Sequence, residues 1–254
     1  MITSLQNPVI KQIKELQSKK AARKKQSLFI VEGIRGVKEI PAKKELISYL
    51  VVTEKLVAEI PEHLHVPKCY IVSEEVFAKV SETQSPQGML AVVKIPKQTL
   101  EGLSLTEGKY LILENLQDPG NLGTIIRSAH AFNFKAILMT KGCVDAFSPK
   151  VVRSTMSSLF YLPIIVEEDI KAYMMAFKKE NVKVYVTALN DTAKTIQSID
   201  FPENAALVIG NEGNGVTPYC IEKADQTMII PMPGGAESLN ASVAAAICMY
   251  EMTR

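Results

Sequence analysis

From residue 109 onward, short apolar runs alternate with stretches of helical periodicity, and this alternation restricts the possible folds more than any other feature. Strands are expected at Tyr110–Glu114, Ala136–Met139, Pro163–Val166, Val182–Ala188, Ala206–Ile209 and Thr227–Ile230, and helices at Gly120–Phe132, Pro149–Leu159, Asp169–Lys179, Pro218–Ala224 and Ser238–Met252. Strands at this spacing predict a parallel sheet covered by helices on both faces. We therefore expect an α/β domain over residues 109–254.

A smaller α/β domain is expected before it. Its strand-like runs are Leu28–Val31, Ile47–Val52, Cys69–Val72 and Met89–Val93, with short helical pieces between them. A first helix is expected to begin at Asn7 and Pro8, which favour a cap and a first turn. The segment 97–108 shows little periodicity and is interpreted as a linker. The predicted domains are therefore 1–96 and 109–254.

Composition excludes several classes of protein. Hydrophobic residues make up 47% of the 254, enough for a packed core. No run approaches the roughly 20 apolar residues of a membrane span, and no apolar signal core follows the N-terminal lysines, so we expect a cytoplasmic protein. The four cysteines form no CxxC pair. His63, His65 and His130 lack metal-binding spacing, so no metal is expected.

The net charge of +2 conceals an uneven distribution. Residues 1–98 hold 16 Lys and Arg against 10 acidic residues, whereas residues 99–254 hold 13 against 17. The first part is therefore the better candidate to contact phosphates. Its densest basic cluster comprises Lys19, Lys20, Arg23, Lys24 and Lys25. Contact with RNA and a solvated basic helix face are both compatible with this cluster.

Three unusual segments each follow an expected strand, the position where open parallel sheets bind ligands. The first, Glu114–Arg127, contains Asn121 between Gly120 and Gly123. Arg127 lies off the apolar stripe of the helix that follows. An arginine there suits a phosphate or a ribose, and a solvent-exposed arginine fits the same spacing.

The second segment, Val208–Val216, is rich in glycine but lacks the Lys-Ser/Thr ending of a P-loop. It also comes too late in the chain for a dinucleotide fingerprint. Glu212 within it would repel a phosphate and suits hydroxyl or amino groups. A plain glycine-rich turn is the alternative interpretation.

The third segment, Ile229–Val243, contains two prolines, which restrict its backbone, followed by Gly234 and Gly235, which allow an unusual turn. Such an apolar loop suits a flat, mostly neutral ligand such as adenosine. Ser238 is expected to cap the final helix. Asn240 would then lie inside the first helical turn, a position that structure alone explains poorly.

Together, the motifs PGNLGTIIRSAHAF, LVIGNEGNGV and IPMPGGAESLNASVAAAI resemble the three signature motifs of the SpoU (TrmH-like) branch of the SPOUT RNA methyltransferases, in order and at typical separation. The resemblance covers about residues 108–254. A weaker one, carried by TSLQNPVIKQIKEL, FIVEG and SPQGMLAVV, links the first part to the small α/β, ribosomal-protein-like RNA-binding domain that precedes many members.

This resemblance implies a C-terminal α/β domain with a deep trefoil knot, an exception to the rule that chains avoid knots. It implies S-adenosylmethionine as cofactor, bound at Gly210, Ile230 and Leu239 with Met232 nearby. It also implies a homodimer formed through the C-terminal domain, with each site completed across the interface. The reaction would transfer a methyl group to a ribose 2′-hydroxyl without a metal.

The resemblance assigns Arg127 to activation of that hydroxyl. A guanidinium with a pKa above about 12 is a poor base, so we expect Arg127 to stabilise the developing alkoxide instead. Asn121 would position Arg127 or the ribose, while Glu212, Ser238 and Asn240 would shape the site.

The expected substrate is rRNA, because a separate basic domain precedes the catalytic one, and tRNA is the alternative. Methylation of a base and a non-catalytic RNA-binding protein that retains the fold are the rival functions. The intact set of candidate catalytic residues argues against a pure RNA-binding role.

Overall fold

The computed structural model describes residues 1–43, 45–64, 66–167 and 169–254, which leaves His65 outside the described residues. The chain forms two compact units. The first comprises Met1–Lys97 together with Asp145–Phe160, and the second comprises Gln98–Val144 and Tyr161–Arg254. None of the described helices is long and apolar enough to cross a membrane.

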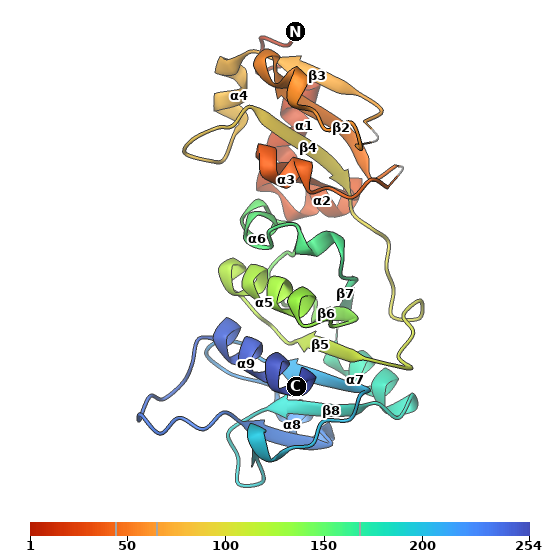
Figure 1. Ribbon diagram of the computed structural model, residues 1–254, viewed down its shortest axis with the longest axis vertical. Helices are drawn as coiled ribbons and strands as arrows, with labels where there is room; N and C mark the ends of the chain where they lie inside the picture. The colour runs from red at the N-terminus through yellow and green to blue at the C-terminus, as the bar shows by residue number, and fades with distance from the viewer. Residues whose placement is uncertain (44, 65, 168) are drawn as a thin grey trace. The chain divides into compact units, whose positions relative to one another are not determined.

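The first unit is built on a four-stranded mixed sheet in the order β1-β4-β2-β3 (Figure 1). Its elements are α1 (Pro8–Ser18), α2 (Lys20–Gln26), β1 (Leu28–Glu32), α3 (Ile34–Lys38), β2 (Ile47–Thr53), the 3-10 helix η1 (Glu54–Glu59), β3 (Cys69–Val72), α4 (Glu74–Val80), β4 (Met89–Lys94), α6 (Pro149–Ser154) and η2 (Ser158–Phe160). Strand β4 pairs antiparallel with β1 and β2, and β3 pairs parallel with β2. The predicted α/β character of this part is confirmed.

Helix α1 begins where the sequence predicts. The side chain of Asn7 accepts a hydrogen bond from the Val9 N–H at 2.9 Å, and Pro8 occupies the first turn. The helix ends at Ser18, because Lys19 adopts an extended backbone. The basic cluster therefore lies mostly on a separate short helix, α2.

The segment 145–160 departs from the expected domain division, because its contacts are with the first unit. The ring of Phe147 packs on Phe29 with centroids 5.1 Å apart, and the Ser157 hydroxyl donates to Glu39 at 2.7 Å. The predicted helix over 149–159 is also interrupted. Met156 and Ser157 have φ of 48° and 66°, which an α-helix cannot accommodate.

The second unit contains a seven-stranded sheet in the order β7-β6-β5-β10-β8-β11-β9, and all of its pairings are parallel. Its elements are β5 (Lys109–Leu113), α5 (Pro119–Ala131), β6 (Ala136–Thr140), β7 (Ile164–Glu167), α7 (Ile170–Lys179), β8 (Lys183–Thr187), β9 (Lys194–Thr195), the 3-10 helix η3 (Ile196–Ser198), β10 (Ala205–Ile209), α8 (Pro218–Lys223), β11 (Gln226–Ile229) and α9 (Ala241–Thr253). The predicted parallel sheet is confirmed. The two-residue β9 was not predicted.

Both faces of this sheet are covered. Tyr110 and Ile112 of β5 belong to a buried cluster that includes Tyr173 of α7, whereas the alternating residues Leu111 and Leu113 are fully buried on the opposite face. Helices α5 and α9 lie side by side in this unit (Figure 1).

The stretch expected to be a linker has no helix or strand, but it is fixed to the second unit. Leu105 is buried in that unit's core, and the Gln98 side chain accepts a hydrogen bond from the Ile164 N–H at 2.8 Å. Residues 98–108 thus pack against the second unit and belong to it.

Candidate active site

The first candidate segment follows β5 at the carboxyl edge of the sheet. Asp118 caps α5, and its carboxylate accepts the N–H of Asn121 at 2.7 Å. The cap orients the start of the helix and places the Asn121 side chain in a nearly buried position. Asn121 is therefore available as a fixed donor and acceptor.

The second segment follows β10 and closes into a tight loop. Asn211 and Gly215 exchange two backbone hydrogen bonds of 2.9 Å, and the Asn211 side chain accepts the N–H groups of Gly213 and Asn214. Gly210 lies against the end of this loop. A Cβ there would come within 2.5 Å of the Val216 nitrogen and closer still to the Gly215 carbonyl, so only glycine fits.

Glu212 extends from this loop to the first segment. Its carboxylate accepts the N–H groups of Gln117 at 3.1 Å and Asp118 at 2.9 Å. It also accepts a bond of 3.1 Å from the Asn121 amide. The Glu212 carboxylate thus joins the two loops. All three groups that it contacts are hydrogen-bond donors, as the sequence suggested.

The third segment ends at α9, whose cap differs from the prediction. Asn240, rather than Ser238, caps the helix, because its side-chain oxygen accepts the N–H groups of Ser242 and Val243. Its amide group donates to the Asn121 oxygen at 2.9 Å. Asn240 thus lies outside the helix, and it continues a hydrogen-bonded chain from Glu212 through Asn121.

The pKa of Glu212 lies below the ordinary value of 4.5. Burial raises it, but the N–H groups of Asp118, Gln117 and Glu212 itself and the amide of Asn121 lower it by more. A carboxylate with a depressed pKa stabilises the fold above its unfolded pKa, and this contribution is lost as the pH falls through the folded value.

We therefore expect Glu212→Gln to destabilise the protein most at neutral pH, because the amide replaces one acceptor oxygen by a donor. The difference in unfolding free energy from wild type should shrink as the pH is lowered below 4.5. Urea denaturation from neutral pH down to about pH 3 measures it. A difference that stays constant over this range would contradict the assigned hydrogen bonds.

A cavity of about 460 Å³ lies between the second and third segments. All four predicted cofactor-binding residues, Gly210, Ile230, Met232 and Leu239, line it, and so do the predicted catalytic residues Glu212 and Ser238. Asn121 and Asn240 do not line the cavity and are joined to it through Glu212, while Ala241 and Ala244 line it from the first turns of α9. The volume is typical of a small-molecule site.

The sequence interpretation missed one wall of this cavity. Residues 187–189, at the end of β8, also line it. The available signal was their position after a strand, because ligand sites in such sheets lie beyond the carboxyl ends of neighbouring strands. Nothing in their residue types marked them out.

Arg127 does not line the cavity. It lies on the exposed face of α5, opposite the buried Leu122, Ile126 and Ala129, as the helical spacing predicted. Among the described residues its guanidinium has no hydrogen bond or ion pair. The side chain is therefore free to contact solvent or a bound molecule, and its predicted role in the reaction stays a prediction.

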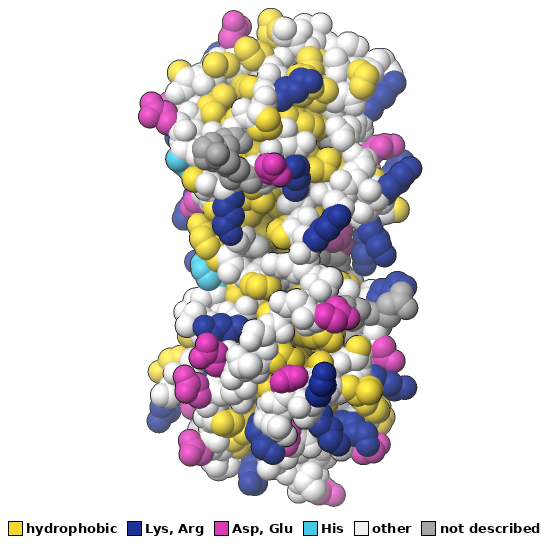
Figure 2. Space-filling view, turned by 90° about the vertical axis from the view of Figure 1, so that its right-hand side faces the viewer, with side chains coloured by type: hydrophobic (Ala, Val, Ile, Leu, Met, Phe, Trp, Pro, Cys, Tyr) yellow, Lys and Arg dark blue, Asp and Glu magenta, His cyan; other side chains and the backbone are white. Residues whose placement is uncertain are grey.

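Four residues of the basic cluster, Lys19, Lys20, Lys24 and Lys25, are exposed. Lys19 pairs with Glu15 at 3.7 Å, an exposed contact of low strength. On the face shown in Figure 2, basic and acidic side chains are interspersed and do not form one basic patch. Charge alone therefore does not single out an RNA-binding surface on that face.

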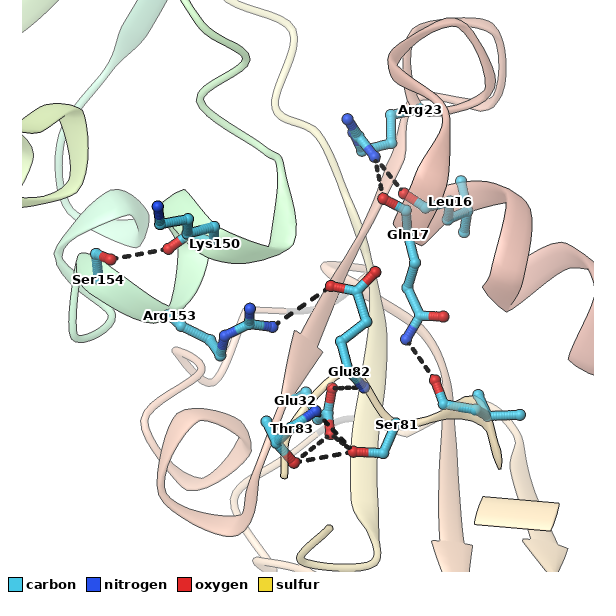
Figure 3. A network of polar contacts seen from close by, with 11 residues as sticks. Leu16, Gln17, Arg23, Glu32, Ser81, Glu82, Thr83, Lys150, Arg153 and Ser154 are labelled. Atoms are coloured by element: carbon cyan, nitrogen blue, oxygen red, sulfur yellow. Dashed lines mark hydrogen bonds and ion pairs between the residues drawn. The ribbon is translucent and has the colours of Figure 1, made fainter. Parts of the chain in front are cut away.

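Arg23 is a correction to the predicted RNA-binding cluster. It is only 5% exposed and pairs with Asp145 at 2.7 Å. It also donates to the carbonyl oxygens of Leu16 and Gln17 (Figure 3). A guanidinium with these partners is a structural link between α2 and the segment 145–160. A second ion pair to that segment joins Glu82 and Arg153 at 3.6 Å, and Figure 3 draws this one.

Comparison with known proteins identifies the family. Residues 108–250 match the SpoU rRNA Methylase family, and residues 7–91 match the MRM3-like substrate binding domain. The first match includes all three loops of the site. The chain belongs to the SpoU rRNA methylase family. The trefoil knot expected for this family stays a prediction.

Similar proteins cover nearly the whole chain. A 23S rRNA (guanosine(2553)-2′-O)-methyltransferase, RlmP, from Bacillus subtilis is 39% identical over 99% of this chain and 98% of its own length. The crystal structure of an rRNA methyltransferase from Sinorhizobium meliloti with bound AdoMet superposes with a TM-score of 0.87, at 28% identity, over 99% of this chain and 96% of that one.

A third relative is the SpoU methyltransferase AviRb from Streptomyces viridochromogenes in complex with AdoMet. It is 25% identical, with a TM-score of 0.86, over 98% of each chain. The predicted family, the class of enzyme and S-adenosylmethionine as cofactor are confirmed. This SpoU methylase is accordingly an S-adenosylmethionine-dependent RNA methyltransferase.

Proposed function

We propose that this SpoU methylase methylates the ribose 2′-hydroxyl of one guanosine in 23S rRNA, the nucleotide that corresponds to the target named for RlmP. One observation carries the proposal: Glu212 lines the cavity and is also hydrogen-bonded to Asn121, which in turn is bonded to Asn240. Identity of 39% along nearly the full length of RlmP, including its first domain, supports the choice of 23S rRNA over tRNA.

The residues present fit S-adenosylmethionine. Gly210 has no side chain, so its main chain forms part of the cavity wall. The other predicted cofactor-binding residues, Ile230, Met232 and Leu239, line the cavity with apolar side chains. Such a wall suits an adenosyl group, which is recognised by main-chain polar groups and flat apolar contacts. The bound cofactor would supply an electrophilic methyl group on its sulfonium.

The residues of this chain would orient the ribose and stabilise the negative charge that develops on the 2′-oxygen as its proton leaves. Asn121 is held rigid by Glu212 on one side and Asn240 on the other, so it can position a hydroxyl with little loss of entropy. Ser238 lines the cavity beside them. Arg127, always protonated, would stabilise the developing alkoxide.

We also propose a homodimer, in which a partner chain covers α5 and α9. These helices run in parallel, because Asn121 contacts Asn240 at their starts and Phe132 contacts Tyr250 near their ends. Most residues of α9 are apolar, and Val243 and Tyr250 are about half exposed on it, at 47% and 52%. Apolar surface of this kind marks an interface, and it adjoins the helix that presents Arg127.

The remaining assignments are proposals as well. The predicted domains 1–96 and 109–254 would act as a substrate-binding and a catalytic part, with the segment 145–160 packed on the first of them. Lys19, Lys20, Lys24 and Lys25 would contact rRNA phosphates. Because its proposed substrate is ribosomal RNA, the protein would act in the cytoplasm.

The proposed reaction is tested with RNA that lacks the modification. Purified protein and tritiated S-adenosylmethionine should label 23S rRNA from a strain without the gene and leave wild-type rRNA almost unlabelled. Resistance of one phosphodiester to alkaline hydrolysis then locates the 2′-O-methyl group. Label on a base or on tRNA would contradict the proposal. Calorimetric uptake of S-adenosylmethionine excludes a purely RNA-binding function.

A further inference from the structure

Glu114 is a buried carboxylate that the proposed reaction does not use. It directly follows β5 and is 2% exposed. Among the described residues no lysine or arginine pairs with it. A buried carboxylate without a counter-ion is unfavourable unless its oxygens are hydrogen-bonded, so its partners indicate what it stabilises.

Its partners all belong to the start of α8. One carboxylate oxygen accepts the Thr217 N–H at 2.8 Å and the Cys220 thiol at 3.4 Å. The other accepts the Thr217 hydroxyl at 2.9 Å. Burial, together with the charge of Glu114, raises the pKa of Cys220 to about 12, so the thiol keeps its proton and donates it.

Thr217 is the residue at which the loop 210–216 ends. Val216, directly before it, lines the cavity, whereas neither Thr217 nor Glu114 does. At the other end of the loop, the Glu114 N–H donates to the Ile209 carbonyl at 2.9 Å. Glu114 therefore contacts both ends of the loop. Its main chain bonds Ile209 before the loop, and its side chain bonds Thr217 after it.

Glu212 makes the reverse contact. It belongs to the loop after β10, and its carboxylate accepts the N–H groups of residues 117 and 118 in the segment after β5. The segment after β5 and the segment after β10 thus each hold the other through a carboxylate. A loop fastened at its entry, middle and exit keeps its shape before a ligand arrives, which lowers the entropic cost of binding.

We propose that Glu114 is a positioning residue for the cofactor, acting through Thr217 to keep the 210–217 loop in its binding shape. It contacts neither cofactor nor RNA. The proposal rests on the proposed function, in which this loop holds S-adenosylmethionine. Loss of the contact loosens the loop and weakens cofactor binding, while the reacting groups stay in place once the cofactor is bound.

The test compares Thr217→Val, which removes only the hydroxyl, with Thr217→Ser, which keeps it. Calorimetry with S-adenosylmethionine and steady-state methylation of unmodified rRNA are measured on the full chain. Thr217→Val should raise both the Kd and the KM for S-adenosylmethionine about 10-fold, the effect of one hydrogen bond to a charged group. Its kcat at saturating cofactor should stay within about twofold of wild type, and Thr217→Ser should resemble wild type.

Glu114→Ala should show the same pattern with a larger rise in Kd, because all three bonds are lost. A merely structural role predicts a different result, namely a smaller active fraction with a lower kcat and an unchanged KM. That result, or a Thr217→Val variant with wild-type Kd, overturns the role of Glu114 alone. If wild-type protein takes up no S-adenosylmethionine, the proposed function fails, and this proposal fails with it.

Discussion

Gly210→Ala is expected to weaken S-adenosylmethionine binding about 100-fold. The added Cβ would overlap main-chain atoms of Gly215 and Val216, which cannot rotate away as a side chain could. The loop must shift, and an overpacked site of this kind costs roughly 3 kcal/mol or more. A loss of that size raises the Kd about 100-fold. Isothermal titration calorimetry with S-adenosylmethionine measures it.

Gly234→Ala is the matched control. It makes the same chemical change, but its Cβ would meet nothing within 4 Å, and Gly234 does not line the cavity. Its Kd should stay close to that of wild type. Tight cofactor binding by Gly210→Ala would show that the loop can open without penalty, contrary to the packing described.

Arg127→Ala is expected to lower kcat for RNA methylation by roughly 100- to 1,000-fold, the loss seen when one group that stabilises transition-state charge is removed. Arg127 is exposed and lies away from the cavity, so the Kd for S-adenosylmethionine and the melting temperature should barely change. Tritiated-methyl transfer and calorimetry on the same preparation separate the two effects. Equal activity of variant and wild type would refute the assigned role.

A mixture of Arg127→Ala and Gly210→Ala subunits tests whether Arg127 acts across the proposed dimer. A heterodimer has one intact cofactor site facing one intact arginine only if the arginine reaches the partner's site. Mixing should then restore methylation that neither variant shows alone. Continued inactivity of the mixture, with heterodimers present by native mass spectrometry, would place Arg127 in its own subunit's site.

At the start of α9 and at Arg23, a residue far away in the chain accounts for what local sequence preference did not predict. Serine and asparagine are both good helix caps, so local preference could not decide between Ser238 and Asn240. The bond from Asn240 to Asn121, from a segment 119 residues away, accompanies the observed choice. Arg23 in a lysine-rich stretch looked like a surface charge, and only its distant partner Asp145 accounts for its burial.

The loops of the site were predictable because their requirements are local. Glycine at a close main-chain approach, asparagine at a helix start and apolar residues in a strand follow from backbone sterics and burial, so residue types and spacing were sufficient to mark the three segments as candidate site loops. The family and its cofactor came from the resemblance of their motifs to the SpoU signature. Partners far apart in the chain were not predictable in this way. Strands β5 and β10 are far apart in the sequence but pair directly in the sheet, and this pairing brings Glu114 to Thr217. Such contacts depend on strand order, which no local preference specifies.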